Sequence, residues 1–283
     1  MKLVKLILED FTLSNEKDLK SPLVYNFGRK RLDYFFLNWN FKENLVKRIA
    51  GVKVYFGLIP NLPVRELTSG DLDIIYNELK HQRNISEDDI KKVIQGSAPY
   101  KNPYDLVISI PSSGKLNLTV SKIIKSLNPN KDCRVVSLEK AIYTVDAMVN
   151  QEKYDTSDPV TKKMVDTWMK RLVNLYGVEK ELPIKVSPDP TTGHPGLQSG
   201  ARTLLRNKFK EDLPFLLLKN MKILVVDDNL VSGDTVEQAF SLLQSKKVPK
   251  ENLTGYVFSV KKLPGDYLSQ LSADIQDPEK YRL

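Results

Sequence analysis

Residues 221–235 read Met221-Lys222-Ile223-Leu224-Val225-Val226-Asp227-Asp228-Asn229-Leu230-Val231-Ser232-Gly233-Asp234-Thr235. The apolar part, up to residue 226, predicts a buried strand, and a helical pattern follows at residues 236–245. Between them lie two carboxylates and a turn of small and hydroxyl residues. Such a turn directs backbone N–H groups and hydroxyls at a phosphate, where the helix dipole also favours negative charge. The two carboxylates can accept hydrogen bonds from ribose hydroxyls or lie near a hydrated Mg2+. The arrangement is therefore suited to holding a phosphorylated sugar.

Two other interpretations account for part of this string. The run at residues 223–229 is also typical of the start of a response-regulator receiver domain, which needs roughly 100 further residues. Only 55 residues remain after Asp228, and residues 267–276 do not supply the second acid-bearing strand that such a domain requires. The plainer alternative, a buried strand with a solvated acidic turn, stays open.

The same residues resemble the 5-phosphoribosyl 1-diphosphate (PRPP) loop of type I phosphoribosyltransferases. That family's pattern is an apolar strand, two acids, two or three variable residues, small or hydroxyl residues, Gly, any residue, then Thr. The resemblance implies that Asp227 and Asp228 are catalytic residues that hold the ribose hydroxyls and bind Mg2+, directly or through water. It also implies a loop that wraps the 5′-phosphate, formed by Val231, Ser232, Gly233, Asp234 and Thr235.

The loop departs from the family pattern at two positions. Val231 stands where Thr is common, and Asp234 adds a negative charge inside the loop. Because Asp234 occupies the variable position of the motif, we expect its carboxylate to point to solvent; pointing inward, it would weaken phosphate binding. Gly233 provides a turn without a Cβ, where the backbone must approach an anion closely.

A second strand, turn and helix occur earlier in the chain. Residues 104–110 predict a strand, Pro111 begins a turn of small residues, and apolar residues at helical spacing follow over 118–127. A nucleotide P-loop is excluded, because it would need Gly at Ser109 and Ser or Thr at Leu116. In the phosphoribosyltransferase family a loop at this place cradles the diphosphate leaving group, and the resemblance assigns to it Ser112, Ser113, Gly114 and Lys115. Lys115 would act in catalysis by offsetting diphosphate charge, although an ordinary turn with a surface Lys also fits the pattern.

The stretch between the two loops contains a candidate lid. Residues 187–198 are rich in Pro and Gly and predict a loop, and the segment from Gln198 to Phe209 is similar to the competence-associated ComF family. The cysteine-rich zinc ribbon with which ComF-like proteins usually begin is excluded, because Cys133 is the only cysteine. Reactions through a sugar cation need water kept out, and mobile loops commonly close for that purpose. We expect His194 and the catalytic Arg202 to reach the diphosphate or the incoming nucleophile from this lid; a solvated loop histidine explains His194 equally well.

The composition is that of a soluble α/β enzyme. Hydrophobic residues make up 41% of the 283 positions, and no apolar run approaches the roughly 20 residues needed to span a bilayer. The single cysteine allows no internal disulfide, which is consistent with a cytoplasmic location. The net charge is +8, and residues 159–222 hold 12 Lys or Arg against 6 Asp or Glu. This excess suits a polyanionic substrate such as PRPP and leaves a nucleic-acid partner open.

These observations predict a type I phosphoribosyltransferase-like α/β fold, with a mostly parallel sheet, helices on both faces and a variable hood. We expect residues 1–100 to form an N-terminal α/β hood or extension, and residues 101–283 to form the core with an insertion or lid at about 139–215. Helices are also predicted at residues 32–49, 141–148 and 161–176, the last of them amphipathic. Because members of the family often dimerise, the resemblance also leaves a homodimer open.

The favoured function is a phosphoribosyltransferase of nucleotide metabolism, which transfers ribose 5-phosphate from PRPP to a nitrogenous base, releases diphosphate and requires Mg2+. The expected acceptor is a small-molecule base. Two alternatives remain: a nucleic-acid-binding or nucleic-acid-modifying protein of the same fold, and a non-catalytic regulator that senses PRPP. Silent members of the fold tend to lose residues of the diphosphate loop or lid, and both are recognisable in this chain, which favours an enzyme.

Overall fold

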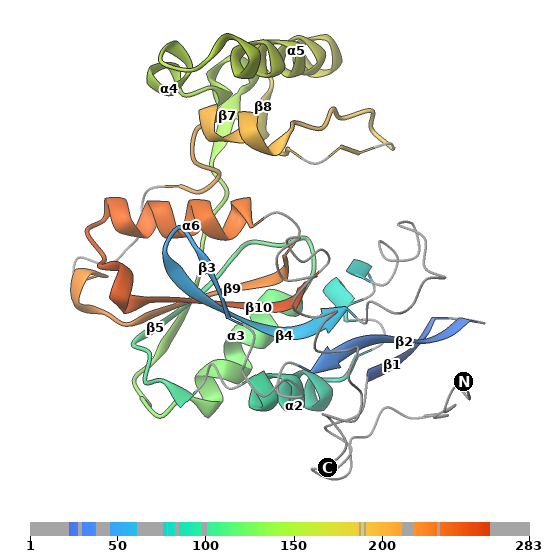
Figure 1. Cartoon of the computed structure of the whole chain (residues 1–283), viewed down its shortest axis with the longest axis vertical. Helices are drawn as coiled ribbons and strands as arrows, with labels where there is room; N and C mark the ends of the chain where they lie inside the picture. The colour runs from blue at the N-terminus through green and yellow to red at the C-terminus, as the bar shows by residue number, and fades with distance from the viewer. Residues whose placement is uncertain are drawn as a thin grey trace, which may run out of the picture. The chain divides into compact units, whose positions relative to one another are not determined.

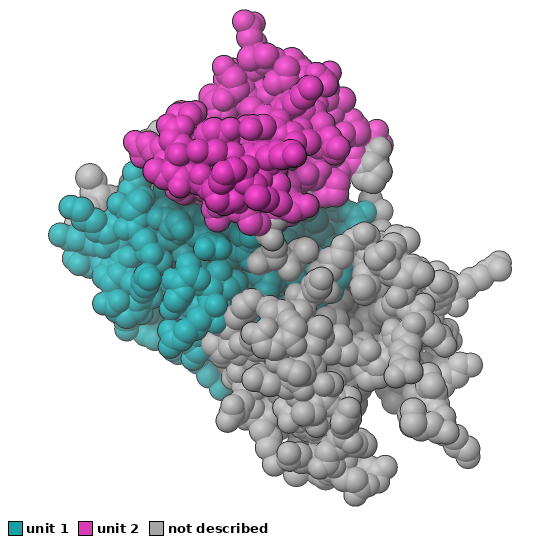
Figure 2. Space-filling model, turned by 45° about the horizontal axis from the view of Figure 1, so that its top comes forward, with its two compact units in different colours: residues 1–137, 216–283 teal, residues 138–215 magenta. Residues whose placement is uncertain are grey.

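The chain divides into two compact units. The computed structural model (Figure 1) describes residues 23–27, 30–37, 46–60, 76–77, 79–82, 85–97, 101–186, 188–189, 191–210, 218–230 and 233–260. Unit 1 comprises Met1–Ser137 and Leu216–Leu283, and unit 2 comprises Leu138–Phe215 (Figure 2). The insertion predicted at about 139–215 covers the same stretch as unit 2, and its role as a lid stays a prediction.

In the part of the chain that the structure describes, unit 1 contains a sheet of eight strands in the order β1-β2-β4-β10-β9-β5-β6, with β3 paired to β4. The neighbours β4, β10, β9, β5 and β6 run parallel, whereas β1, β2 and β3 are antiparallel to their partners. The strands are β1 (Leu23–Phe27), β2 (Lys30–Leu37), β3 (Val46–Ile49), β4 (Val52–Pro60), β5 (Leu106–Ser109), β6 (Arg134–Ser137), β9 (Ile223–Leu230) and β10 (Leu253–Val260). The prediction of an α/β fold with a mostly parallel sheet is confirmed.

Helices cover both faces of this sheet, with α2 and α3 on one face and α6 on the other (Figure 1). Their bounds are Glu87–Ser97 (α2), Leu116–Leu127 (α3) and Asp234–Ser245 (α6). Two successive residues of β10 illustrate the division. A Cβ on Gly255 would lie 3.0 Å from Phe240 Cζ of α6. The next side chain points the opposite way, since the Tyr256 hydroxyl lies 3.0 Å from Ser97 Oγ of α2.

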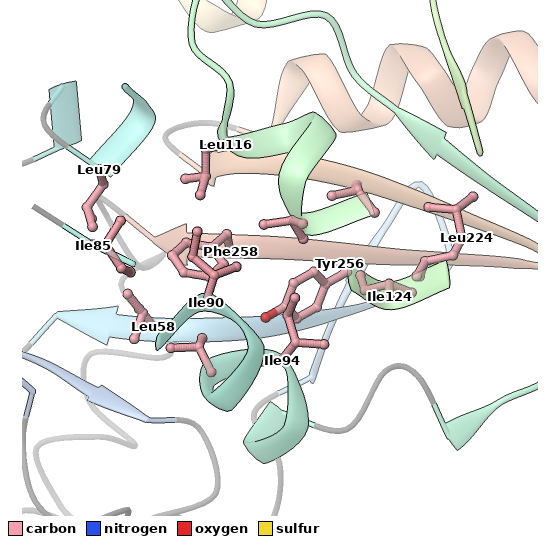
Figure 3. Close-up of a cluster of buried hydrophobic side chains, with 14 of the residues drawn as sticks. Leu58, Leu79, Ile85, Ile90, Ile94, Leu116, Ile124, Leu224, Tyr256 and Phe258 are labelled. Atoms are coloured by element: carbon pink, nitrogen blue, oxygen red, sulfur yellow. The ribbon is translucent and has the colours of Figure 1, made fainter. Parts of the chain in front are cut away.

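The core of unit 1 lies between α2, α3 and the central strands. Residues 223–226 of β9 are all buried, as is typical of parallel strands that are covered on both faces. On α3 the buried apolar positions recur every fourth residue and turn one stripe of the helix toward the sheet. The side chains that meet there include Leu58, Ile90, Ile94, Leu116, Ile124, Leu224, Tyr256 and Phe258 (Figure 3). Each buried side chain of this size stabilises the fold by about 1.5–3 kcal/mol, so the start of α3 is firmly held.

The helix predicted at residues 32–49 is wrong. The described parts of this segment belong to strands β2 and β3, and β2 pairs antiparallel with both β1 and β4. Three consecutive aromatic residues, Tyr34, Phe35 and Phe36, favour a strand, because aromatic side chains suit a pleated, partly covered surface.

Unit 2 has a core of its own, in which Val165, Trp168 and Leu172 are buried. Its elements are β7 (Ile142–Thr144), a 3-10 helix (Val145–Met148), α4 (Gln151–Asp155), α5 (Pro159–Tyr176), β8 (Glu181–Pro183) and a second 3-10 helix (Ser199–Leu204). The helix predicted at 161–176 is confirmed as α5. Its N-terminus is fixed by Asp158, whose carboxylate accepts a hydrogen bond from Thr161 N at 2.9 Å. The helix predicted at 141–148 is wrong in its first part, because β7 pairs antiparallel with β8 there.

Candidate functional site

The two predicted loops leave the sheet at the same edge. Strands β5 and β9 are parallel neighbours with Ser109 opposite Val226, and Ile110 N donates to Val226 O at 2.9 Å. After β5 the chain passes through α3 to β6, and after β9 it passes through α6 to β10 in the opposite direction. In open α/β sheets, ligands bind outside the carboxyl ends of the strands where the strand order reverses in this way.

A hydrogen bond joins the two loops directly. The Ser112 hydroxyl donates to Asp228 Oδ2 at 2.5 Å, and Ser112 Oγ accepts from the backbone N–H of Gly114 at 3.3 Å. A hydroxyl-to-carboxylate bond of this length is charge-assisted and stronger than a neutral one. The structure thus brings a residue of the predicted diphosphate loop to a residue of the predicted sugar-binding pair.

Asp227 is buried beside this contact. The residue is 6% exposed, and its Oδ1 accepts hydrogen bonds from Asn117 Nδ2 at 3.3 Å and from the backbone N–H of Asp228 at 3.0 Å. Burial, reinforced by the charge of Asp228, raises the pKa of Asp227 well above the ordinary value of an aspartate. Asp227 therefore holds a proton more tightly than an exposed aspartate does, and a bound cation or a set of hydroxyl donors would favour its ionised form.

The predicted diphosphate loop is closely packed against Lys80 at Gly114. A Cβ on Gly114 would lie 2.0 Å from the carbonyl oxygen of Lys80 and 2.7 Å from Lys80 Cγ. No other residue fits at this position unless the backbone moves. Ser113 and Lys115 are exposed, and Lys115 lies at the N-terminal end of α3. An ammonium in this place can meet an anion that approaches the edge of the sheet.

The predicted phosphate loop is described only in part, because Val231 and Ser232 lie outside the described residues. Gly233 is buried and precedes α6 with φ 87° and ψ −8°, a left-handed conformation that accounts for the glycine. Thr235 is half-buried in the first turn of α6. The described part of the predicted loop, residues 233–235, thus begins with a left-handed turn at the glycine of the motif.

The start of α6 is acidic. Asp234 and Glu237 place two carboxylates in its first turn, where the helix dipole attracts negative charge. These carboxylates compete with a phosphate for the same electrostatic stabilisation. Asp234 is half-buried, and the expectation that its carboxylate points to solvent stays a prediction.

His194 is integrated into the packing of unit 2. Its Nε2 lies 2.7 Å from the carbonyl oxygen of Lys185, and since a carbonyl can only accept, Nε2 carries the proton. Nδ1 then accepts from the Tyr176 hydroxyl at 3.3 Å. Both ring nitrogens have partners within unit 2, and the contact of His194 with the diphosphate or the incoming nucleophile stays a prediction.

Arg202 lies on the second 3-10 helix of unit 2. Its Nε donates to the carbonyl oxygen of Leu197 at 2.8 Å, which anchors the guanidinium on the end of the Pro- and Gly-rich loop at residues 187–198. The contact of Arg202 with diphosphate stays a prediction.

Two polar residues at the edge of the sheet are missed by sequence reasoning. Asn117, in the first turn of α3, donates to Asp227 and also to the carbonyl oxygen of Ile110 at 2.8 Å. Ser259, on β10, donates through its hydroxyl to the backbone carbonyl oxygen of Asp228 at 2.9 Å. Their sequence signal is weak, because the start of α3 also carries the polar Thr119 and β10 also carries the polar Thr254.

The acidic pair fits a Mg2+ ion that arrives with its ligand. Among the described residues, no group of three or more His, Cys, Asp or Glu side chains is placed to hold a metal ion. Mg2+ commonly takes one or two carboxylates and leaves its other positions to water and substrate phosphates. Asp227 and Asp228 are therefore suited to share an ion with a phosphorylated substrate.

No protein-family model matches the chain, and no curated protein matches it in sequence. Of the helices that the structure describes, none combines the length and the apolar character needed to cross a membrane. The function is therefore argued from the geometry of the site.

Proposed function

We propose that the protein is a phosphoribosyltransferase, which transfers ribose 5-phosphate from Mg2+-bound PRPP to a nitrogenous base and releases diphosphate. The supporting observation is the Ser112–Asp228 hydrogen bond at the point where the strand order reverses. PRPP carries a diphosphate on C1 and hydroxyls on C2 and C3. It therefore needs diphosphate contacts and hydroxyl acceptors at one edge of one sheet.

Each group at this edge has a part in the proposal. Asp227 and Asp228 accept hydrogen bonds from the ribose hydroxyls, and the turn before α6 holds the 5′-phosphate. The diphosphate lies against the loop formed by Ser112, Ser113, Gly114 and Lys115. A ribose hydroxyl replaces the Ser112 hydroxyl on Asp228, so Ser112 becomes available to donate to the diphosphate.

The proposed reaction is a substitution at C1 of the ribose. The C1–O bond breaks and its electron pair leaves with the diphosphate, while the nitrogen lone pair of the base forms the C1–N bond from the opposite face. The nitrogen then loses its proton to solvent. Because the transition state resembles an oxocarbenium ion, positioning and stabilisation of the diphosphate contribute more than a strong protein base. Lys115 offsets the charge that the diphosphate gains, and Mg2+ supplies further charge stabilisation when bound.

Calorimetric titration of the full chain with PRPP and Mg2+, and then with inorganic diphosphate, tests the site. We expect both to bind at one site, and Lys115→Ala to weaken diphosphate binding about 10-fold. Lys125→Ala is the matched control, because Lys125 is an exposed lysine near the opposite end of the same helix. Absence of PRPP binding contradicts the proposal. Release of diphosphate when a library of bases is offered with PRPP establishes the transfer.

A PRPP-sensing regulator is the second candidate, and the same hydrogen bond favours it. The Ser112–Asp228 bond gives the diphosphate loop a defined arrangement that a ribose hydroxyl must displace. Such a loop could report ligand binding to a partner without any reaction. Tight PRPP binding with no diphosphate release from any base would support this candidate over an enzyme.

A nucleic-acid acceptor gains no support from the charge of unit 2. Residues 138–215, which form unit 2, hold 12 Lys or Arg against 11 Asp or Glu. The basic excess of residues 159–222 is thus nearly cancelled within the unit by the acidic stretch that precedes it. A unit with almost no net charge lacks the surplus of cations that drives binding to a nucleic-acid backbone.

A further inference from the structure

We propose that Asn117 is a positioning residue that orients Asp227 for the ribose and ties it to the start of the diphosphate loop. This inference rests on the proposed function. Asn117 lies outside both loop motifs, and its role follows from its contacts in the folded chain.

One amide group joins three elements at the edge of the sheet. Asn117 Nδ2 donates to Ile110 O at 2.8 Å and to Asp227 Oδ1 at 3.3 Å. Since the carbonyl oxygen of Ile110 can only accept, the nitrogen of the amide must face it, which fixes the orientation of the side chain. Ile110 follows β5 directly, Asn117 begins α3, and Asp227 lies near the end of β9. The two hydrogens of the amide therefore link the diphosphate side of the site to its ribose side.

The side-chain amide of Asn117 includes a buried oxygen that is unfavourable for stability. Asn117 is 2% exposed, and its Oδ1 is buried with no hydrogen-bond partner among the described residues. A buried acceptor without a partner destabilises a protein. The other buried positions of α3 are the apolar Leu116, Val120 and Ile124 and the polar Ser121. Unlike Ser121, Asn117 donates both amide hydrogens to residues at the edge of the sheet, Ile110 and Asp227, and these two bonds point to a requirement for its donors.

The contact decides which oxygen of Asp227 meets the ligand. Oδ1 is occupied by Asn117 and by the backbone N–H of Asp228, so Oδ2 is the oxygen presented to a ribose hydroxyl. Without the amide, Asp227 Oδ1 accepts a hydrogen bond only from the backbone N–H of Asp228, and the carboxyl group can rotate. A group that is not held in one orientation loses much of its effect on the ligand. The diphosphate is held by other residues, Ser112 to Lys115, and depends less on Asn117.

Two ligands separate positioning from a general structural role. In Asn117→Leu, which keeps the size but removes the donors, we expect the Kd for Mg2+-bound PRPP to rise about 10-fold or more. The Kd for inorganic diphosphate should change by less than about 3-fold, because Asp227 does not contact it. Calorimetry on the full chain measures both. In an Asp227→Asn background, Asn117→Leu should weaken PRPP binding little further, since both changes act on the same contact.

Matched variants complete the experiment. Ser121→Ala alters a wholly buried residue one turn further along α3, whose Oγ also has no hydrogen-bond partner among the described residues, and should leave the affinity for PRPP unchanged. Asn117→Ser keeps one hydroxyl donor, which can serve Ile110 or Asp227 but not both. We expect this variant to fold and to bind PRPP with an intermediate affinity.

The outcomes distinguish this inference from the function on which it rests. Equal weakening of PRPP and diphosphate binding, no weakening of either, or failure of both Asn117 variants to fold would each overturn the positioning role and leave the transferase proposal intact. If the unaltered chain binds no PRPP, the proposed function is overturned and the role of Asn117 with it.

Discussion

Buried polar side chains occur in both units, but their hydrogen-bonding groups are satisfied to different degrees. In unit 2, Trp168 Nε1 donates to the carbonyl oxygen of Pro195 at 3.0 Å, and both nitrogens of His194 have partners. At the edge of the sheet in unit 1, Asp227 is a buried carboxyl group with a strongly raised pKa, and Asn117 Oδ1 has no hydrogen-bond partner among the described residues. The buried polar groups of unit 2 stabilise its packing, whereas those at the edge of the sheet in unit 1 include groups that lower the stability of the fold.

This difference gives a reason, independent of any motif, to test polar residues at the edge of the sheet for a role in binding. Fully bonded polar groups stabilise a unique packing, whereas incompletely satisfied ones reduce stability and tend to persist where a ligand makes use of them. The acidic pair remains the predicted site, and His194, which sequence reasoning assigns to a lid, has both ring nitrogens bonded within unit 2.

The largest expected effect follows from Asp227→Asn. Loss of the ionisable acceptor should weaken PRPP binding about 100-fold, because hydrogen bonds to charged groups are the strong ones. The free energy of unfolding at neutral pH should rise by about 1 kcal/mol or more, since each unit of pKa shift corresponds to about 1.4 kcal/mol. Calorimetry and urea unfolding measure the two effects.

Asp105→Asn is the control for that variant. Asp105 lies at the opposite end of β5 and accepts from Lys222 N at 2.8 Å and from Asn130 Nδ2 at 3.0 Å. In Asp105→Asn, the amide nitrogen would face one of these two N–H donors and could not accept its hydrogen bond. The variant should therefore lose stability and keep its affinity for PRPP. If the two variants behave alike, the contrast between functional and structural carboxylates fails.

His194→Leu tests the comparison from unit 2. The change leaves the Lys185 carbonyl and the Tyr176 hydroxyl without their partner, which should lower the free energy of unfolding by about 1–3 kcal/mol. Tyr176→Phe, which removes only the hydroxyl, should lower it by about 0.5–1.5 kcal/mol. Affinity for PRPP should not change in either variant. A stable His194→Leu protein with weakened PRPP binding would instead support the lid.

The pH dependence of stability should differ between the two units. Asp227 has a folded-state pKa raised above its value of 3.8 when unperturbed, so its contribution to stability is present at low pH and is lost as pH rises through the folded-state pKa. In unit 2, the hydrogen bond from Lys185 lowers the pKa of Asp189 to about 2, so its contribution is present above 3.8 and lost as pH falls.

Urea unfolding between about pH 4 and about pH 9 measures this dependence. Relative to Asp227→Asn, the free energy of unfolding of the unaltered chain should fall by at most about 1.4 kcal/mol per pH unit while Asp227 is ionised in the unfolded chain and protonated in the folded one. Parallel pH profiles for the two proteins would contradict the raised pKa.

The smallest expected effect concerns the acidic first turn of α6. Glu237→Gln removes one of its two carboxylates and should tighten PRPP binding about 2-fold to 3-fold, an effect that salt reduces. Glu251→Gln, at an exposed glutamate before β10, should change nothing. Unchanged affinity in Glu237→Gln would place the 5′-phosphate away from this helix.

The sequence predicted the elements that carry the two loops, because each has a continuous signal. The apolar runs before Ser112 and Asp227 became β5 and β9, and the helical patterns that follow became α3 and α6. Residues 32–49 were mistaken for a helix because their apolar spacing is ambiguous, and only pairing with β1 and β4 selects the strand. Local patterns do not record which distant strand will be a partner.

The sequence indicates that the two loops belong to one site, but it does not predict which of their residues are in contact. The bond from Ser112 to Asp228 joins residues 116 positions apart, and the bond from Asn117 to Asp227 joins residues 110 apart. Asn117 resembles an ordinary polar residue of a helix start until the fold buries it. Its importance depends on what it contacts, which sequence periodicity does not contain.

The strand order also has a consequence for biosynthesis. Lys53 of β4 lies opposite Thr254 of β10, so the parallel neighbour of β4 is made only after about 200 further residues. Unit 2 is continuous in sequence, and its residues pack against one another within Leu138–Phe215. While the chain is on the ribosome, β4 and β5 therefore each lack a neighbouring strand until β9 and β10 emerge. Unpaired strand edges of this kind favour the aggregation of nascent chains.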